Sequence, residues 1–412
     1  SRSDGGLSPK QEWYGVGGGE SAHIGVDPRG QNVVWATTYN GVVERTNLRT
    51  GQQRNVQAYP ELLVGKAPVS RRYRFQWHAP VRISPHDPDV VYHGAQVVLR
   101  TDDGGQSWEK ISPDLTRNDT TKQRLSGGPI TFEGAGAEIY NTIFALEESP
   151  HEPGVIWVGS DDGLVHLTRD GGGSWEDVTP DDLPPWSTVN TIEISPHDPG
   201  RVFLSVFRYR RDDWAPYVYR TDDYGETWRR LTDGTNGIPA DHPVRVVRED
   251  PDRRGLLYAG TEFGVFVSFD DGRRWQPFQL DLPVSPVTDL RVHRQDLVVA
   301  TQGRSFWILD DLTPLHQLGE EVAASEIHLY EPREVYRMSV SGHRGERAPE
   351  APAQGALFRY YFREKPPGPV SLEILDRDGN VVRTFSREGG GRPPIPAGSP
   401  PSRRGGFRRK RE

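Results

Sequence analysis

The feature that most constrains the fold is a motif that occurs four times: Ser or Thr, any residue, Asp, any residue, Gly, two further residues and Trp. The copies begin at Thr101, Thr168, Thr221 and Ser268, which lie 67, 53 and 47 residues apart. A short motif that returns at such a period indicates a repeat architecture built from small sheets. Four-stranded blades of a β-propeller recur at periods of this size, so the spacing predicts an all-β propeller.

The residue types of the motif fit a tight turn inside each blade. The Asp carboxylate accepts backbone N–H bonds, the Gly supplies a positive φ, and the Trp begins an outer strand with its ring between two blades. We therefore interpret the repeated pairs as structural. These pairs are Asp103 and Trp108, Asp170 and Trp175, Asp223 and Trp228, and Asp270 and Trp275. A catalytic acid in every copy is the less favoured alternative, because the hairpin itself needs these residues.

A second repeat marks the other half of each blade, at residues 84–88, 149–153 and 195–199, with a looser copy at 249–251. Its Ser-Pro-His-Asp/Glu-Pro pattern is typical of a turn between strands. The three His residues recur once per blade and should lie far apart around a ring, so we predict no shared metal site and no cofactor. The chain has no Cys, which excludes disulfides, thiolate metal sites and Cys nucleophiles.

The two repeats together divide the chain into blades at residues 21–57, 79–111, 138–178, 189–231, 243–278 and 288–309. The sixth unit lacks an outer strand, and residues 11–17 resemble the strand that follows the motif in the other blades. A strand from the N-terminal end would cover two exposed sheet edges. We therefore predict a six-bladed propeller over residues 1–318, closed by residues 11–17, with seven blades as the alternative.

Three further segments follow the predicted propeller. Residues 319–355 are rich in Gly, Pro and charge and are expected to form a linker. Residues 356–390 show alternating strands and a hairpin, which predicts part of an immunoglobulin-like β-sandwich. Residues 391–412 carry seven basic residues and one acidic residue and are predicted to be a disordered tail.

Charge and hydropathy exclude some classes of partner. The net charge is −8, and without the basic tail the remainder of the chain is still more acidic, which disfavours nucleic-acid binding by the main domain. No apolar run is long enough to span a bilayer. The chain begins without Met or a signal-like segment, so we expect a piece of a longer polypeptide.

The four motifs, with the phrases at residues 159–165 and 303–311, resemble the large bacterial BNR or Asp-box repeat proteins related to sortilin, which are described as glycosyl hydrolase-like. The resemblance covers roughly residues 11–320 and extends into the sandwich. It implies the C-terminal propeller of a longer protein, with a second propeller as partner and a secreted, periplasmic or cell-surface location. Asp boxes also occur in sialidases and xyloglucanase-type hydrolases; in the latter, the cleft lies between two propellers, with one carboxylate from each.

In a propeller, the loops that enter the inner strands share one face with the turns between second and third strands. We call this face the loop face. The four repeated motifs, called Asp boxes below, lie on the opposite face, which we call the box face. The loop face nominates a set of ligand-binding candidates: Trp77, His78, Tyr140, Asp162, Arg208, Tyr209 and Arg304. The candidates for catalytic carboxylates are Glu138, Asp161 and Glu262. In each of these three, satisfying turn N–H groups or a neighbouring Arg is the more favoured role.

Two functional hypotheses follow from this face. The first is a rigid platform that binds a glycan, a peptide or a protein partner. The alternative is a glycoside hydrolase, xyloglucanase-like or sialidase-like, that uses carboxylates of the loop face. Hydrolysis of a glycosidic bond needs two carboxylates about 5 to 10 Å apart, one of them kept protonated. Sialidase chemistry also needs an Arg cluster and a Tyr-Glu pair, and no pattern in this sequence identifies them, which makes it the less favoured form.

Overall fold

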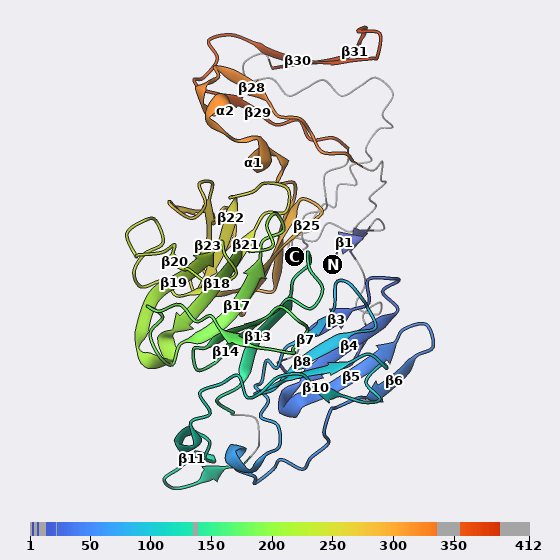
Figure 1. The fold of residues 1–412 in the computed structure, drawn as a ribbon. Coiled ribbons are helices and arrows are strands. Elements are labelled where there is room, and N and C mark those ends of the chain that lie inside the picture. The colour runs from blue at the N-terminus through green and yellow to red at the C-terminus, as the bar shows by residue number, and fades with distance from the viewer. Residues whose placement is uncertain are drawn as a thin grey trace, which may run out of the picture. The chain divides into compact units, whose positions relative to one another are not determined.

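The computed structural model describes residues 2–3, 6–7, 14–21, 23–134, 139–335 and 355–387. The chain divides into two compact units (Figure 1), of which the first comprises residues 1–316 and 335–355 and the second residues 317–334 and 356–412. Residues 11–13 of the predicted closing strand, most of the predicted linker and the basic tail lie outside the described residues.

The first unit is a six-bladed β-propeller, as the repeats predicted. Five of its sheets are antiparallel meanders of four strands, and the sixth has three described strands. The first three blades comprise β3 (Ile24–Val26), β4 (Val33–Thr38), β5 (Val42–Asn47) and β6 (Gln52–Asn55); β7 (Val81–Ile83), β8 (Val91–Gly94), β9 (Val98–Thr101) and β10 (Glu109–Lys110); and β13 (Ile143–Glu148), β14 (Ile156–Ser160), β15 (Val165–Thr168) and β16 (Glu176–Asp177).

The remaining three blades follow the same order of strands. They comprise β17 (Thr188–Ile194), β18 (Val202–Arg208), β19 (Asp213–Thr221) and β20 (Arg229–Arg230); β21 (Val244–Glu249), β22 (Leu257–Thr261), β23 (Gly264–Ser268) and β24 (Gln276–Pro277); and β25 (Val287–His293), β26 (Asp296–Thr301) and β27 (Phe306–Leu309). Two single turns of 3-10 helix join strands within a blade: η2 (Tyr39–Gly41) and η5 (Tyr209–Arg211). The other short elements lie between or before blades: β1 (Arg2–Ser3), β2 (Gly6–Leu7), β11 (Ser126–Gly127), β12 (Phe132–Glu133), η3 (Pro68–Ser70) and η4 (Thr120–Lys122).

The middle strands are apolar on both faces because each blade is covered on both sides by its neighbours. In β14 of the third blade every residue is buried. Ile156 and Val158 pack into a core shared with the second blade, whereas Trp157 packs into a core shared with the fourth. Successive side chains of a strand point to opposite faces, so a run without polar alternation serves two seams at once. Burial of a side chain as large as Trp157 contributes a few kcal/mol.

The Asp boxes tie each blade to the one before it. In the first box the Asp103 carboxylate accepts the backbone N–H groups of Gln106 and Ser107 at 2.8 and 3.0 Å. These bonds help hold the pKa of Asp103 well below its usual range. The indole N–H of each box Trp donates to a backbone carbonyl of the preceding blade: Trp108 to Val56 at 2.8 Å, Trp175 to Ile111 at 2.9 Å, Trp228 to Val178 at 2.7 Å and Trp275 to Leu231 at 3.3 Å.

The His residues of the second repeat link each blade to the one after it. The Nε2 atom of His86 donates to the backbone carbonyl of Ser149 at 2.7 Å, in the equivalent turn of the next blade. His151 donates in the same way to Ser195, and His197 to Asp250, both at 2.8 Å. Each imidazole thus joins a different pair of neighbouring blades, which accounts for the periodic spacing of the His residues.

β27 is the last described strand of the sixth blade. It pairs with β26 on one edge, and its other edge pairs with no strand among the described residues. Phe306 on this strand is 75% exposed. Residues 14–17 are described and form no strand, and the N–H of Gly18 donates to the Glu44 carboxylate of the first blade at 2.7 Å. Residues 11–13 lie outside the described residues, so closure of the ring by segment 11–17 stays a prediction.

The second unit contains two small antiparallel sheets and α2 (Glu320–Ala324), while α1 (Thr313–Gln317) lies at the boundary. β28 (Ile327–Leu329) pairs with β29 (Tyr360–Phe362), so the segment predicted as a linker supplies one helix and one strand to this unit. β30 (Val370–Leu375) and β31 (Val381–Arg387) form the hairpin that the sequence indicated. The assignment of this unit to part of an immunoglobulin-like sandwich stays a prediction. None of the helices within the described ranges is long and apolar enough to cross a membrane.

Candidate functional site

Asp161 lies on the loop face in the turn after β14, but its side chain points into the protein and is fully buried. One carboxylate oxygen accepts the backbone N–H of Thr142 at 2.9 Å. The other accepts the hydroxyl of Thr142 at 2.8 Å and the side-chain amide of Gln76 at 3.0 Å. Burial, together with the charge of Asp162, raises the pKa of Asp161 to about 7.

Asp162 is also fully buried, and it anchors the long insertion between the second and third blades. Its Oδ2 atom accepts the backbone N–H of Arg117 at 2.9 Å and the side-chain amide of Asn141 at 2.6 Å. Its Oδ1 atom accepts the hydroxyl of Ser160 at 2.6 Å. The two adjacent carboxyl groups therefore join three segments of chain beneath the loop face, and neither is exposed to a ligand in solution.

The other two carboxylate candidates have different surroundings. Glu262 follows β22 and accepts a hydrogen bond from Arg245 Nε at 2.5 Å. Its side chain is 13% exposed, so it is within reach of solvent but paired. The Arg245 guanidinium also lies 5.8 Å from the ring centroid of Phe207 and 5.5 Å from that of Tyr209. Glu138 lies outside the described residues.

The aromatic candidates of the loop face lie in contact with other rings. Trp77 lies 5.7 Å from Tyr39 between ring centroids, and His78 lies 5.6 Å from Phe144. Desolvation and the charges of nearby arginines lower the pKa of His78. Tyr209 is stacked on Phe207 at 4.9 Å. Of the remaining candidates, Arg304 is exposed in the turn between β26 and β27.

The loop face contains a cavity of about 390 Å³ over the third and fourth blades. Its lining comprises Lys122, Tyr140, Trp186, Thr188, Phe207, Arg208, Arg210 and Arg211. Tyr140 and Arg208 were nominated by the sequence, and the structure brings them together here. The other six were not nominated. The adjacent arginines of the turn after β18, and the Trp that follows two prolines before β17, are the signals in the sequence that could have found them.

Trp186 forms one wall of the cavity in a conformation that a bulky residue seldom adopts, with φ of 65°. Its ring is stacked near Tyr140, with 6.3 Å between centroids. Arg208 holds the residues on either side of Trp186: it donates to the Pro185 carbonyl at 2.6 Å and to the Ser187 hydroxyl at 3.2 Å. Backbone strain that the surroundings hold in place is often found at binding sites.

Positive charge surrounds the same ring. The Lys122 ammonium lies 3.9 Å from the Trp186 ring centroid, and the guanidinium groups of Arg117 and Arg211 lie at 5.5 and 5.9 Å. Arg210 lies 5.7 Å from the ring centroid of Phe207. The lining contains four cationic side chains and no carboxylate, so the cavity presents aromatic surface and positive charge.

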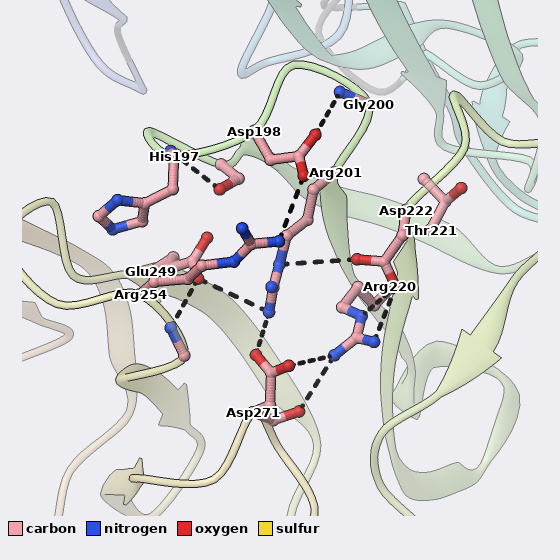
Figure 2. Close-up of polar contacts among 12 residues, drawn as sticks. His197, Asp198, Gly200, Arg201, Arg220, Thr221, Asp222, Glu249, Arg254 and Asp271 are labelled. Carbon is pink, nitrogen blue, oxygen red and sulfur yellow. Dashed lines mark hydrogen bonds and ion pairs between the residues drawn. The ribbon is translucent and has the colours of Figure 1, made fainter.

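A charged cluster on the box face differs from the cavity because its arginines are paired with carboxylates (Figure 2). Arg201, whose side chain is buried, forms ion pairs with Asp271 and, at 3.6 Å, with Glu249. Arg220 pairs with the other oxygen of Asp271 at 2.9 Å and with Asp222 at 2.7 Å. The cluster joins the fourth blade to the fifth, and its cations are matched by carboxylates. We interpret it as a structural contact between blades.

One group among the described residues has the donors for a metal ion: Asp250, Asp252 and His316. The Asp250 carboxylate already accepts hydrogen bonds from His316 Nε2 at 3.0 Å and from the Tyr258 hydroxyl at 2.9 Å. It also accepts the backbone N–H of Asp252 at 2.8 Å. These bonds account for the cluster as part of the turn that replaces a Ser-Pro-His turn in the fifth blade.

No family model matches the chain. A probable oligoxyloglucan-reducing end-specific xyloglucanase of Neosartorya fischeri is 21% identical over 299 residues, which are 66% of this chain and 34% of the relative. A xyloglucanase of Acetivibrio thermocellus is 28% identical over 144 residues, which are 30% of this chain and 17% of the relative. A solved GH74 xyloglucanase from Xanthomonas campestris covers 70% of this chain and 44% of its own, at 17% identity and a TM-score of 0.49.

This chain therefore spans about a third or less of the length of the curated relatives. The curated matches support a glycoside hydrolase-like propeller. They do not single out the sortilin-related BNR family that the sequence motifs resemble.

Proposed function

We propose that the loop face of this propeller binds a glycan, as one part of a longer glycoside hydrolase-like protein. The observation that carries the proposal is the cavity over the third and fourth blades, with Tyr140, Trp186 and Phe207 in its lining. Aromatic rings offer apolar faces against which the C–H groups of a sugar ring pack, and the polar side chains around them can bond its hydroxyls. The cavity volume is within the range of small-molecule sites.

The names of the curated relatives favour a glycan over a peptide or protein as ligand, because both are named for action on xyloglucan. In the first relative the shared region covers 66% of this chain. A glycan is therefore the partner class that both the cavity and the relatives support.

Glycoside hydrolysis is the second candidate, and the same relatives favour it. On this face the carboxylates have other partners: Asp161 and Asp162 are buried, and Glu262 is paired with Arg245. Glu262 is the described carboxylate candidate with access to solvent. A hydrolase built on this propeller would need a second carboxylate about 5 to 10 Å from the first.

A panel of soluble oligosaccharides, titrated into the full chain and followed by calorimetry, tests glycan binding. We expect saturable binding that Trp186→Ala weakens by about tenfold or more, because the variant removes the aromatic wall. Phe306→Ala is the matched control, since Phe306 is exposed on the sixth blade, away from the cavity. Absence of binding to every glycan tested would refute the proposal.

Release of reducing ends from polysaccharides by the same protein separates the second candidate from the first. Hydrolysis that Glu262→Gln abolishes would establish this carboxylate as part of a catalytic site. Binding without hydrolysis would leave the propeller a glycan-binding module, and hydrolysis unchanged in the variant would exclude Glu262.

A further inference from the structure

The geometry points to an anionic sugar as the ligand of the cavity: we propose that Arg210 and Arg211 bind the negative group of an acidic glycan, either a uronate carboxylate or a sulfate ester. This inference rests on the proposed function and specifies its substrate class. It departs from the neutral xyloglucan named for the curated relatives.

The first argument is the balance of charge around the cavity. Lys122 forms an ion pair with Asp119, and Arg208 pairs with Asp213 at 2.7 Å. Arg210 and Arg211 form no ion pair with a carboxylate of the described residues, although both are exposed at the rim. Two positive charges are thus left uncompensated at one site.

The second argument is the way this chain treats its other charged clusters. Arg201 and Arg220 on the box face are matched by carboxylates from two blades, as Figure 2 shows. Arg248 of the inner strand β21 pairs with Glu193 at 2.7 Å and with Asp289 at 2.9 Å, one on each neighbouring blade. In these seams positive charge is neutralised within the fold, so the uncompensated pair of arginines at the cavity is suited to an external anion.

The third argument is the crowding of cations around one ring. Lys122, Arg117 and Arg211 all lie within about 6 Å of the Trp186 ring centroid, where each is attracted by the ring but repels the others. A bound anion would relieve this repulsion. Guanidinium groups also offer paired N–H donors that fit a carboxylate or sulfate, and charge-assisted bonds of this kind are stronger than neutral ones.

The aromatic walls distinguish an acidic sugar from a small inorganic anion or an acidic peptide. The Tyr140 and Trp186 rings are stacked with 6.3 Å between centroids, and both line the cavity beside the arginines. A pyranose ring with one acidic substituent has both an apolar face and a charge. This combination matches the site better than a flexible Asp- or Glu-rich peptide, whose ordering on binding costs entropy.

The test compares four probes in calorimetric titrations of the full chain: an oligogalacturonate, a sulfated galactan oligosaccharide, a neutral xyloglucan oligosaccharide and a poly-glutamate peptide. We expect one of the two acidic sugars to bind at least about tenfold more tightly than the neutral one, and to weaken as salt is raised from low to physiological concentration. The two acidic probes distinguish a carboxylate from a sulfate ester.

The variant Arg210→Gln with Arg211→Gln removes both positive charges but keeps polar side chains, and it should lose at least about tenfold in affinity for the acidic sugar. Arg229→Gln is the control, because Arg229 is exposed on the outer strand β20 of the same blade. An unchanged thermal midpoint in the double variant shows that the loss is not unfolding.

Each other outcome has a definite meaning. Equal binding of neutral and acidic sugars, or an unchanged affinity in the double variant, would overturn the anionic ligand and leave glycan binding standing. Binding of poly-glutamate alone would overturn the glycan and assign the site to acidic peptides. No binding of any sugar would refute the proposed function itself.

Discussion

Gly172 in the second Asp box offers a sharp test of how the blades are joined. A Cβ at this position would lie 2.5 Å from the Ile111 carbonyl oxygen of the preceding blade, whereas real Cβ contacts are longer than 3.0 Å. The same oxygen accepts the indole N–H of Trp175 at 2.9 Å. Gly172→Ala must therefore move the seam between the second and third blades.

Gly171 provides a matched control one residue earlier. It also has a positive φ, 70° against 102° at Gly172, but a Cβ there would meet no atom within 4 Å. Gly171→Ala should therefore lower the free energy of unfolding only by the strain of placing Ala in a left-handed conformation, about 1 to 2 kcal/mol. Gly172→Ala should add overpacking of about 1 to 3 kcal/mol and about 1 kcal/mol for the weakened indole bond.

The two variants should thus differ by roughly 2 to 4 kcal/mol in the free energy of unfolding, and their thermal midpoints by about 5 °C or more. Differential scanning calorimetry of both variants beside the unmodified protein measures this difference. Equal destabilisation by the two substitutions would refute the close approach of box and carbonyl.

Three other predictions follow from the fold. The pKa of Asp161 is raised from 3.8 to about 7, so its carboxyl stabilises the folded state fully below pH 3.8 and loses that contribution as pH rises through 7. Asp161→Asn should therefore reduce the change of the urea midpoint between pH 4.5 and 8. An equally steep change of midpoint with pH in the variant would contradict this prediction. His197→Phe leaves the buried Asp250 carbonyl without a donor and should cost about 1 to 3 kcal/mol in urea unfolding, more than His197→Gln. Removal of residues 1–18 should lower the thermal midpoint markedly, and an unchanged midpoint would count against the closing strand.

The blades could be predicted because each repeat carries its own turn chemistry. Every box contains the carboxylate, the glycine and the indole that its hairpin and seam require, as Asp103 and Trp108 illustrate, so local sequence was sufficient. The spacing of the periodic His residues predicted one imidazole per blade, and each of the three donates to a backbone carbonyl of the next blade. The segment after residue 316 was harder, since β28 finds its partner β29 about thirty residues further along the chain.

The cavity could not be predicted as a whole because it is built from loops that do not repeat. Lys122 comes from an insertion of the second blade, Trp186 from the loop before β17, and Arg210 and Arg211 from the turn after β18. Asp161 was nominated because its turn lies on the loop face, but the backbone N–H of Thr142 draws its carboxylate inward. The position of a residue in its blade predicted the face on which it lies. The direction of its side chain depended on partners distant in the chain.

The same division separates the contacts of the two faces of the propeller. On the box face the repeated turns contact the neighbouring blade, as the indole and imidazole bonds illustrate, and Arg201 adds an ion pair to the next blade. These contacts fix the turns of the box face against one another. The loop face is free of that constraint, because its loops vary in length while the blades beneath them stay fixed. We therefore expect changes of ligand among propellers of this kind to arise from these loops.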